Sequence, residues 1–288
     1  MVRRLNEIDP ITYEVTRQIS TGPTSHPHGH WISSDGKYMV TPDFLSLSST
    51  IINLETDTSV KAEHAGDPGN TVLIAPIATG MMGSTEKYYT ADFLGNTLSV
   101  INTATGKIVK QIDLLEVGAG LPIQSPVSPN DKWMVTAHLV GPNGPPVITV
   151  VDTSVDEIVA TLPCDPGCHG VQWGAKKGGD YYAYVSSKFS NALIVVDPKD
   201  GYNAEIAGKI ILTKESQTKI DDRIIDHAGQ GGQGILTIPN VYEGWIQQTV
   251  EDCDDGDSCS DEINKYLKQL KKSQKDPLNP KFDKDNDE

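Results

Sequence analysis

The feature that most constrains the fold of this chain is an internal repeat. Four segments share a short polar motif, an apolar run rich in β-branched residues, and a turn. They begin TPDFLSLSST at Thr41, TADFLGNTLS at Thr90, TAHLVGPNGP at Thr136 and SSKFSNALIV at Ser186. Their alignment makes Asp43, Asp92, His138 and Lys188 equivalent, with separations of 49, 46 and 50 residues. Repeated units of this length bury their apolar faces against one another, so one architecture is expected throughout.

Each unit also contains an upstream strand that ends in its own turn. The segments HWISSDGKYMVT and QSPVSPNDKWMVT carry the turns SSDGK and SPNDK between short runs of strand-forming residues. Helical periodicity is absent until about residue 260. We therefore predict an all-β fold, a β-propeller with four-stranded antiparallel blades.

The repeat predicts four complete blades and two partial ones. The opening segment, Glu7 to Ile19, supplies only the last two strands of a blade. GGQGILTIPNVYEGWIQQTV, near the other end, supplies only the first one or two. Either the two halves join to close the ring, or further blades precede residue 1 in the intact protein, and we favour the second interpretation.

The character of the sequence changes after residue 250. We expect a propeller over 1–250, an acidic loop with a short amphipathic helix over 251–275, and a disordered tail over 276–288. The apolar face of the helix would contain Ile263, Tyr266, Leu267 and Leu270. The loop partly fits a calcium-binding hand, but Cys253 stands where an oxygen ligand is needed, so a solvated loop is preferred.

Charge and hydropathy exclude two classes of partner. Lysine and arginine total 24 against 39 aspartates and glutamates, a net charge of −15, which argues against nucleic acid and anionic membranes. No apolar run is long enough to span a membrane, and the start, MVRRLNEIDP, lacks the apolar core of a signal peptide. The expected partner is a protein or a small ligand at the mouth of the propeller channel.

The four cysteines form two closely spaced pairs, Cys164 with Cys168 and Cys253 with Cys259. Turn-forming residues separate the members of each pair, so local disulfides are expected. Disulfides favour an oxidising compartment, which predicts a periplasmic or extracellular location. The segment CDPGCH has one residue too many between its cysteines for ordinary covalent haem attachment, so the disulfide is preferred.

The candidate site follows from blade geometry, because the first strand of a blade begins at the face where the second strand ends. Histidines and carboxylates at these two places would line one funnel, and neutral imidazole suits copper, iron and zinc. The predicted metal ligands are His26, His28, His30, His138, His169, Asp43 and Asp92. Copper or zinc is the preferred metal, and haem is less favoured. The alternative is that His-Gly is a structural feature of the repeat, with the glycine allowing close backbone approach.

Three segments carry a resemblance to a known family: VINTATGKIVKQIDL, VVDTSVDEIVATL and IDPITYEVTRQISTG. They resemble YVTN-type β-propeller repeats, whose superfamily includes the haem-binding propeller of nitrite reductase and the propeller of nitrous-oxide reductase. The resemblance implies an extracytoplasmic binding or scaffold module. The alternative that it implies is a redox enzyme subunit, similar to the haem-binding propeller of nitrite reductase or to a copper-linked oxidoreductase component. In that case His28 and His169 would be ligands or proton donors, supported by Asp43, Asp92 and His138. A propeller hosts many activities, so the resemblance specifies fold more than function.

Overall fold

The computed structural model describes residues 3–22, 26–33, 35–44, 48–63, 76–81, 85–139, 144–176, 179–190, 192–212, 217–220, 223–226, 232–235, 237, 242–243 and 246–247. Several predictions lie outside these residues. They are the acidic loop and helix of 251–275, the tail of 276–288, and the pairing of Cys253 with Cys259.

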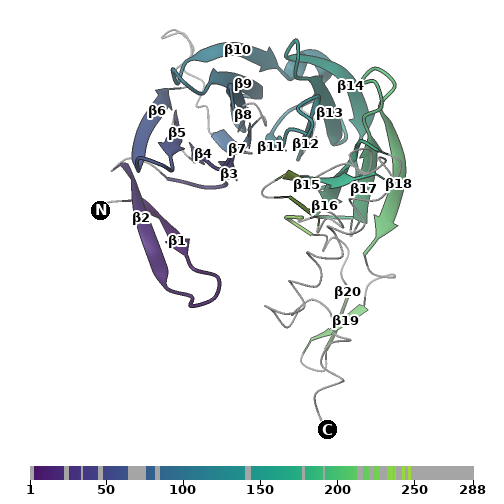
Figure 1. The fold of residues 1–288 in the computed structure, drawn as a ribbon. Helices are drawn as coiled ribbons and strands as arrows, with labels where there is room; N and C mark the ends of the chain where they lie inside the picture. The colour runs from purple at the N-terminus through teal and green to yellow at the C-terminus, as the bar shows by residue number, and fades with distance from the viewer. Residues whose placement is uncertain are drawn as a thin grey trace, which may run out of the picture.

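Four successive four-stranded antiparallel sheets make up most of the described chain (Figure 1). The first sheet contains β3 (Trp31–Ile32), β4 (Tyr38–Asp43), β5 (Ser48–Asn53) and β6 (Thr58–Glu63). The second contains β7 (Pro76–Met81), β8 (Lys87–Asp92), β9 (Thr97–Asn102) and β10 (Ile108–Asp113). The third contains β11 (Pro122–Gln124), β12 (Trp133–His138), β13 (Val147–Asp152) and β14 (Glu157–Pro163). The fourth contains β15 (Cys168–Ala175), β16 (Tyr181–Ser187), β17 (Ala192–Asp197) and β18 (Glu205–Ile211).

The remaining elements are short. Three two-stranded sheets pair β1 (Arg3–Ile8) with β2 (Val15–Gly22), β19 (Gln217–Ile220) with β20 (Arg223–Asp226), and β21 (Tyr242–Glu243) with β22 (Ile246–Gln247). In the part of the chain that is described, the one helical element is a 3₁₀ turn at Leu115–Val117. No helix there is long and apolar enough to cross a membrane. The predictions of an all-β fold and of four complete sheets are confirmed.

The sheets follow one another around an arc (Figure 1). β3, β7, β11 and β15 lie on the inner side of the arc, and β6, β10, β14 and β18 lie on its outer side. β3 contacts β7, β7 contacts β11, and β11 contacts β15. The hairpin of β1 and β2 continues the arc beyond the first sheet, where β2 contacts β6. The fold is therefore propeller-like, with each repeat of the sequence forming one sheet.

Apolar side chains fill the spaces between successive sheets. Alternate residues of a strand point to opposite faces, so each strand serves two cores. Tyr88 of β8 packs in the cluster shared with the first sheet, and Tyr89 packs in the cluster shared with the third. In the same way Met134 of β12 packs toward the second sheet and Val135 toward the fourth. Each sheet thus depends on its neighbours for the burial of both faces.

The inner strands approach so closely that some positions admit only glycine. A Cβ atom on Gly80 of β7 would lie 2.1 Å from the carbonyl oxygen of Ser125. A Cβ atom on Gly170 of β15 would lie 2.6 Å from the carbonyl oxygen of Gln233. Both obstacles are backbone atoms of the following unit, which cannot rotate away as a side chain can. The spacing between sheets is therefore set at the inner edge of the arc.

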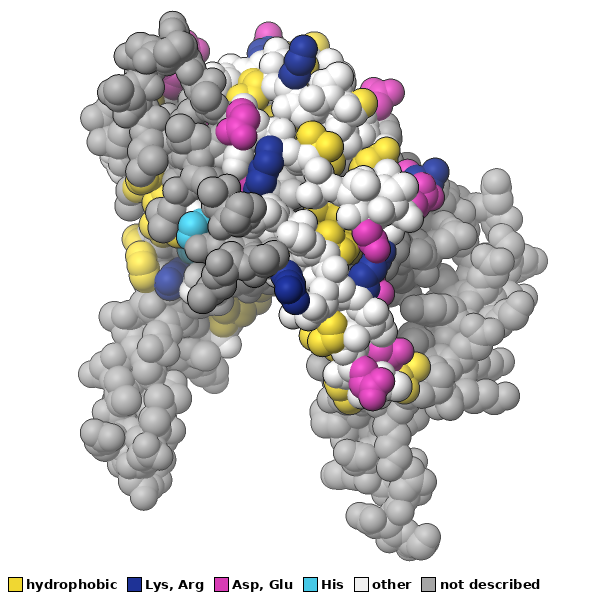
Figure 2. Space-filling model, turned by 90° about the vertical axis from the view of Figure 1, so that its left-hand side faces the viewer, with side chains coloured by type: hydrophobic (Ala, Val, Ile, Leu, Met, Phe, Trp, Pro, Cys, Tyr) yellow, Lys and Arg dark blue, Asp and Glu magenta, His cyan; other side chains and the backbone are white. Residues whose placement is uncertain are grey.

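The surface is mixed in character. On the face shown in Figure 2, basic, acidic and hydrophobic side chains are interspersed. Among the residues whose exposure is described, the most exposed large apolar side chains belong to the turn between β1 and β2, where Ile11 is 79% and Tyr13 is 82% exposed. Scattered exposed apolar residues are normal for a folded chain and need no special explanation.

We expect Gly80→Ala to destabilise the fold by about 1–3 kcal/mol, because the added methyl group must displace backbone of the next sheet. Gly208→Ala in β18 is the matched control, since nothing lies within 4 Å of its Cβ position. The free energy of unfolding, measured by urea titration followed by circular dichroism, should fall for the first variant and stay within ±0.5 kcal/mol or so for the second. Equal stability of the two variants would contradict the close approach of β7 to the third sheet.

Candidate functional site

The predicted site lies at one edge of the sheets, where second strands end and inner strands begin, which we call the strand-end rim. Asp43, Asp92 and His138 are the last residues of β4, β8 and β12. Each pairs through its backbone with a proline where the innermost part of its sheet begins. Asp43 pairs with Pro27, which precedes β3, while Asp92 pairs with Pro76 of β7 and His138 pairs with Pro122 of β11. The equivalence of these three positions, predicted from the repeat, is confirmed.

The fourth sheet departs from the predicted alignment by one residue. Ser187, and not Lys188, pairs with the first residue of the inner strand, Cys168. Ser187 also pairs with Ala192 of β17, as Asp43 pairs with Ser48 of β5. Because side chains alternate along a strand, a shift of one residue turns a side chain to the other face. Lys188 therefore follows the strand end and does not share the environment of the other three residues.

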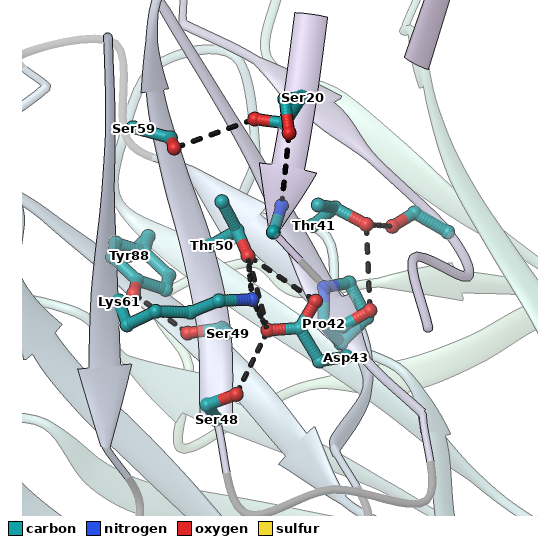
Figure 3. A network of polar contacts seen from close by, with 12 residues as sticks. Ser20, Thr41, Pro42, Asp43, Ser48, Ser49, Thr50, Ser59, Lys61 and Tyr88 are labelled. Carbon is teal, nitrogen blue, oxygen red and sulfur yellow. Dashed lines mark hydrogen bonds and ion pairs between the residues drawn. The ribbon is translucent and has the colours of Figure 1, made fainter. Parts of the chain in front are cut away.

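Asp43 is the centre of a buried polar network (Figure 3). Its Oδ2 accepts hydrogen bonds from Ser48 Oγ at 2.8 Å and Thr50 Oγ1 at 3.0 Å. Lys61 Nζ lies 2.6 Å from the same oxygen, and the Asp43 side chain is fully buried. A buried carboxylate needs such partners to offset the loss of hydration. Here the partners come from β5 and β6, so Asp43 holds three strands of the first sheet together.

Asp92 joins two strands of the second sheet, β8 and β9, through hydroxyl groups. Its Oδ1 accepts a hydrogen bond from Thr90 Oγ1 at 3.0 Å, and its Oδ2 accepts one from Thr97 Oγ1 at 3.0 Å. Ser99 Oγ also donates to Oδ2. The sequence contained a signal for both networks, because each aspartate is followed five and seven residues later by hydroxyl side chains. These pairs are Ser48 with Thr50, and Thr97 with Ser99.

Tyr88 lies between the two carboxylate networks. Its hydroxyl group and Ser49 Oγ are 2.8 Å apart in a hydrogen bond between the second and first sheets. Burial raises the pKa of Tyr88, and the charges of Asp43 and Asp92 raise it further. The phenol therefore stays protonated and serves as a structural link, not as a base.

His138 is also enclosed by its sheet. Its ring is fully buried, and its Nε2 is 2.9 Å from Thr149 Oγ1 on the neighbouring strand β13. Burial lowers the pKa of His138 to about 4, although the backbone of Gly120 partly opposes this by favouring the protonated ring. His138 is thus neutral at physiological pH and occupies the place that a carboxylate occupies in the first two sheets.

His28 and His169 differ from these buried residues. His28 precedes β3 and is exposed, and its ring lies 5.2 Å from the ring of Phe44. His169 is the second residue of β15 and is half-buried. Burial lowers the pKa of His169, and the positive charges of Lys188 and His28 lower it further, while the backbone of Gln233 opposes these effects. His28 and His169 hold equivalent places in the first and fourth sheets, since each directly follows the residue paired with the end of a second strand.

The other two predicted histidines lie on the same approach to β3. His26 and His30 are exposed, and the carbonyl oxygen of His26 accepts a hydrogen bond from the Phe44 amide at 2.8 Å. Across the described ranges, no group of three or more histidine, cysteine, aspartate or glutamate side chains is arranged to hold a metal ion. The seven-residue metal site stays a prediction. Three of its members, Asp43, Asp92 and His138, are engaged in buried hydrogen bonds.

A disulfide lies next to His169. Cys164 and Cys168 are bonded to each other, with their Cα atoms 6.0 Å apart, which confirms the predicted local pairing. Cys164 follows β14 and Cys168 begins β15, so the bond closes the short crossover from the third sheet to the fourth. It restrains the start of the strand that carries His169.

The buried neutral state of His138 predicts a pH dependence of stability. The unfolded histidine titrates near its ordinary value and the folded one near 4, so protons bind preferentially to the unfolded chain as the pH falls. Stability is fully present above about pH 6.5 and declines between there and pH 4. Relative to His138→Gln, the parent should lose about 2 kcal/mol of unfolding free energy between pH 7.5 and pH 5. Urea titrations at both pH values measure this, and identical pH dependence of the two proteins would contradict the burial of a neutral ring.

Comparisons with known proteins give the fold and not the function. No family model matches the chain, and no curated protein matches it. Among solved structures, hydrazine synthase of Kuenenia stuttgartiensis is similar, with a TM-score of 0.56 and 15% sequence identity. The match covers 70% of this chain and 58% of that chain, so this chain spans less than two thirds of the similar protein. At this identity the likeness shows a shared arrangement of β-sheets alone.

Proposed function

We propose that the chain is a β-propeller binding module whose ligand site is the strand-end rim at His28 and His169. The order of the four sheets around an arc supports the propeller. The rim is the place where residues far apart in sequence meet, because every sheet contributes the start of an inner strand and the end of a second strand to it. In propellers and other closed β-architectures such mouths are frequent ligand sites.

The observation that carries this proposal is that His28 and His169 occupy equivalent places in the first and fourth sheets. Each directly follows the residue that pairs with the end of a second strand, because Pro27 pairs with Asp43 and Cys168 pairs with Ser187. The charge of His28 also contributes to the lowered pKa of His169. His28 is exposed and His169 is half-buried, whereas His138 is fully buried. A pair of accessible imidazoles from two separate sheets forms an open site that a small ligand or a partner protein could enter.

Two convergent imidazoles can be detected with a transition metal. Neutral imidazole nitrogen is a good ligand for copper and zinc, and an open site leaves positions for water or a further ligand. These are the metal ions that the sequence favours, and they serve here as probes of the rim. The disulfide of Cys164 and Cys168 supports a periplasmic or extracellular location as part of the same proposal.

The proposal predicts that the parent binds zinc or copper at one principal site, and that His28→Ala combined with His169→Ala abolishes this binding. Isothermal titration calorimetry with each metal alone measures the stoichiometry. The matched control combines His26→Ala with His30→Ala, which removes two exposed histidines near β3 and should leave the principal site in place.

Thermal unfolding of both double variants should match that of the parent, because the four rings are not part of the buried cores. Equal metal binding by the parent and the His28/His169 variant would overturn the assignment of the rim. Loss of binding in the control but not in the test variant would move the site to the segment before β3.

A further inference from the structure

The two ends of the arc expose apolar side chains at positions that the other repeats bury. The β1–β2 hairpin lies at one end of the arc and the fourth sheet lies at the other (Figure 1). Ile8 of the hairpin is 55% exposed and Ile210 of β18 is 46% exposed. Single exposed apolar residues are common, so these two are informative through comparison with their equivalents in the other sheets.

Ile8 is equivalent to a residue that packs against a preceding sheet. The segment IDPITYEVTRQI, which begins at Ile8, aligns without a gap with INTATGKIVKQI, which begins at Ile101. The backbone pairing agrees, because Ile8 pairs with Val15 as Ile101 pairs with Ile108. Ile101 is fully buried in a cluster with residues of the first sheet, and Ile108 packs against the same cluster. In the hairpin the corresponding side chains, Ile8 and Val15, are exposed.

Ile210 is equivalent to a residue that packs against a following sheet. It pairs with Leu193, the second residue of β17, just as Ile112 pairs with Leu98, the second residue of β9. Ile112 and Leu98 are buried in a cluster with residues of the third sheet. Leu193 is half-buried and Ile210 is exposed. The outer half of the fourth sheet therefore presents the face that contacts a following sheet in the other repeats.

A following unit begins on the inner half of the fourth sheet. A Cβ atom on Gly170 would lie 2.6 Å from the Gln233 carbonyl oxygen, the same kind of close approach that Gly80 makes. Thr237 Oγ1 donates a hydrogen bond to the carbonyl oxygen of Trp173 in β15. Among the described residues the hairpin is a sheet of two strands, and its alignment with β9 and β10 makes it the outer half of a unit. The two ends of the arc thus carry complementary halves of one sheet.

We propose that the chain associates head to tail with a second copy of itself. The β1–β2 hairpin of one copy packs on the outer half of the fourth sheet of the next, so that Ile8 and Val15 cover Leu193 and Ile210. This contact reproduces the one between successive sheets within the arc, and the burial of apolar surface drives it. The inference goes beyond the ligand site of the rim and uses none of its histidines.

The partner is a second copy because the hairpin and the fourth sheet of one copy lie at opposite ends of the arc (Figure 1). The contact joins two different surfaces, so it is heterologous, and neither end meets its own equivalent. Contacts of this kind produce closed rings or open chains of copies, depending on the rotation from one copy to the next. Either outcome gives an assembly whose size depends on protein concentration.

The test changes one end at a time in the full chain. Ile8→Glu places a charge on the hairpin, and Ile210→Glu places a charge of the same sign on the fourth sheet, so the two changed ends do not attract each other. Val109→Glu is the matched control, because Val109 is 60% exposed on β10, within the arc. Sedimentation velocity over a wide range of protein concentration measures self-association. Circular dichroism checks that each variant is folded.

We expect the parent to self-associate, and each end variant to lose at least about tenfold in association constant, since a charge must be desolvated at an apolar contact. Val109→Glu should associate as the parent does. An equimolar mixture of the two end variants should form a complex of two copies, because the unchanged fourth sheet of one variant meets the unchanged hairpin of the other. This recovery is specific to a head-to-tail contact.

Three results would overturn the inference. A parent that stays monomeric at every concentration has no second copy on its fourth sheet, whether its ends are free or its hairpin closes on its own fourth sheet. A mixture that stays as dissociated as the separate end variants shows that the two ends do not complement each other. An equal loss of association in Val109→Glu shows a general effect of charge. None of these results bears on metal binding by His28 and His169, so the proposed function is tested separately.

Discussion

The structure depends on the packing of each sheet between two others. A four-stranded sheet with apolar residues on both faces cannot be stable alone, and here alternate residues such as Tyr88 and Tyr89 are buried against different neighbours. The inner strands set the spacing, since Gly80 must admit the backbone of the following unit. Once this spacing is fixed, the strand ends of successive sheets must meet around a common rim.

The rim uses polar residues in two different ways. Where a side chain points between sheets, as for Asp43 or His138, the cost of burial is offset by hydroxyl groups of the next strand, and the residue becomes structural. Where it stays at the open edge, as for His28, the side chain is exposed to solvent. The strand-end rim thus contains both the hydrogen bonds that hold strands together and the residues that we propose bind a ligand.

The sequence by itself determined the repeat, the all-β class, the four sheets and the positions of Asp43, Asp92 and His138 at strand ends, because periodicity and turn residues are local properties. It also predicted the pairing of Cys164 with Cys168, which are close along the chain. Only the tertiary structure decided which side chains face inward, since this depends on the pairing register and on the neighbouring sheet. A register difference of one residue put Ser187 where Lys188 was expected. Packing between sheets buried Asp43, Asp92 and His138 beside hydroxyl groups of the neighbouring strands. The pairing register also placed His28 and His169 directly after the residues that pair with strand ends, because register is a property of the assembled sheet.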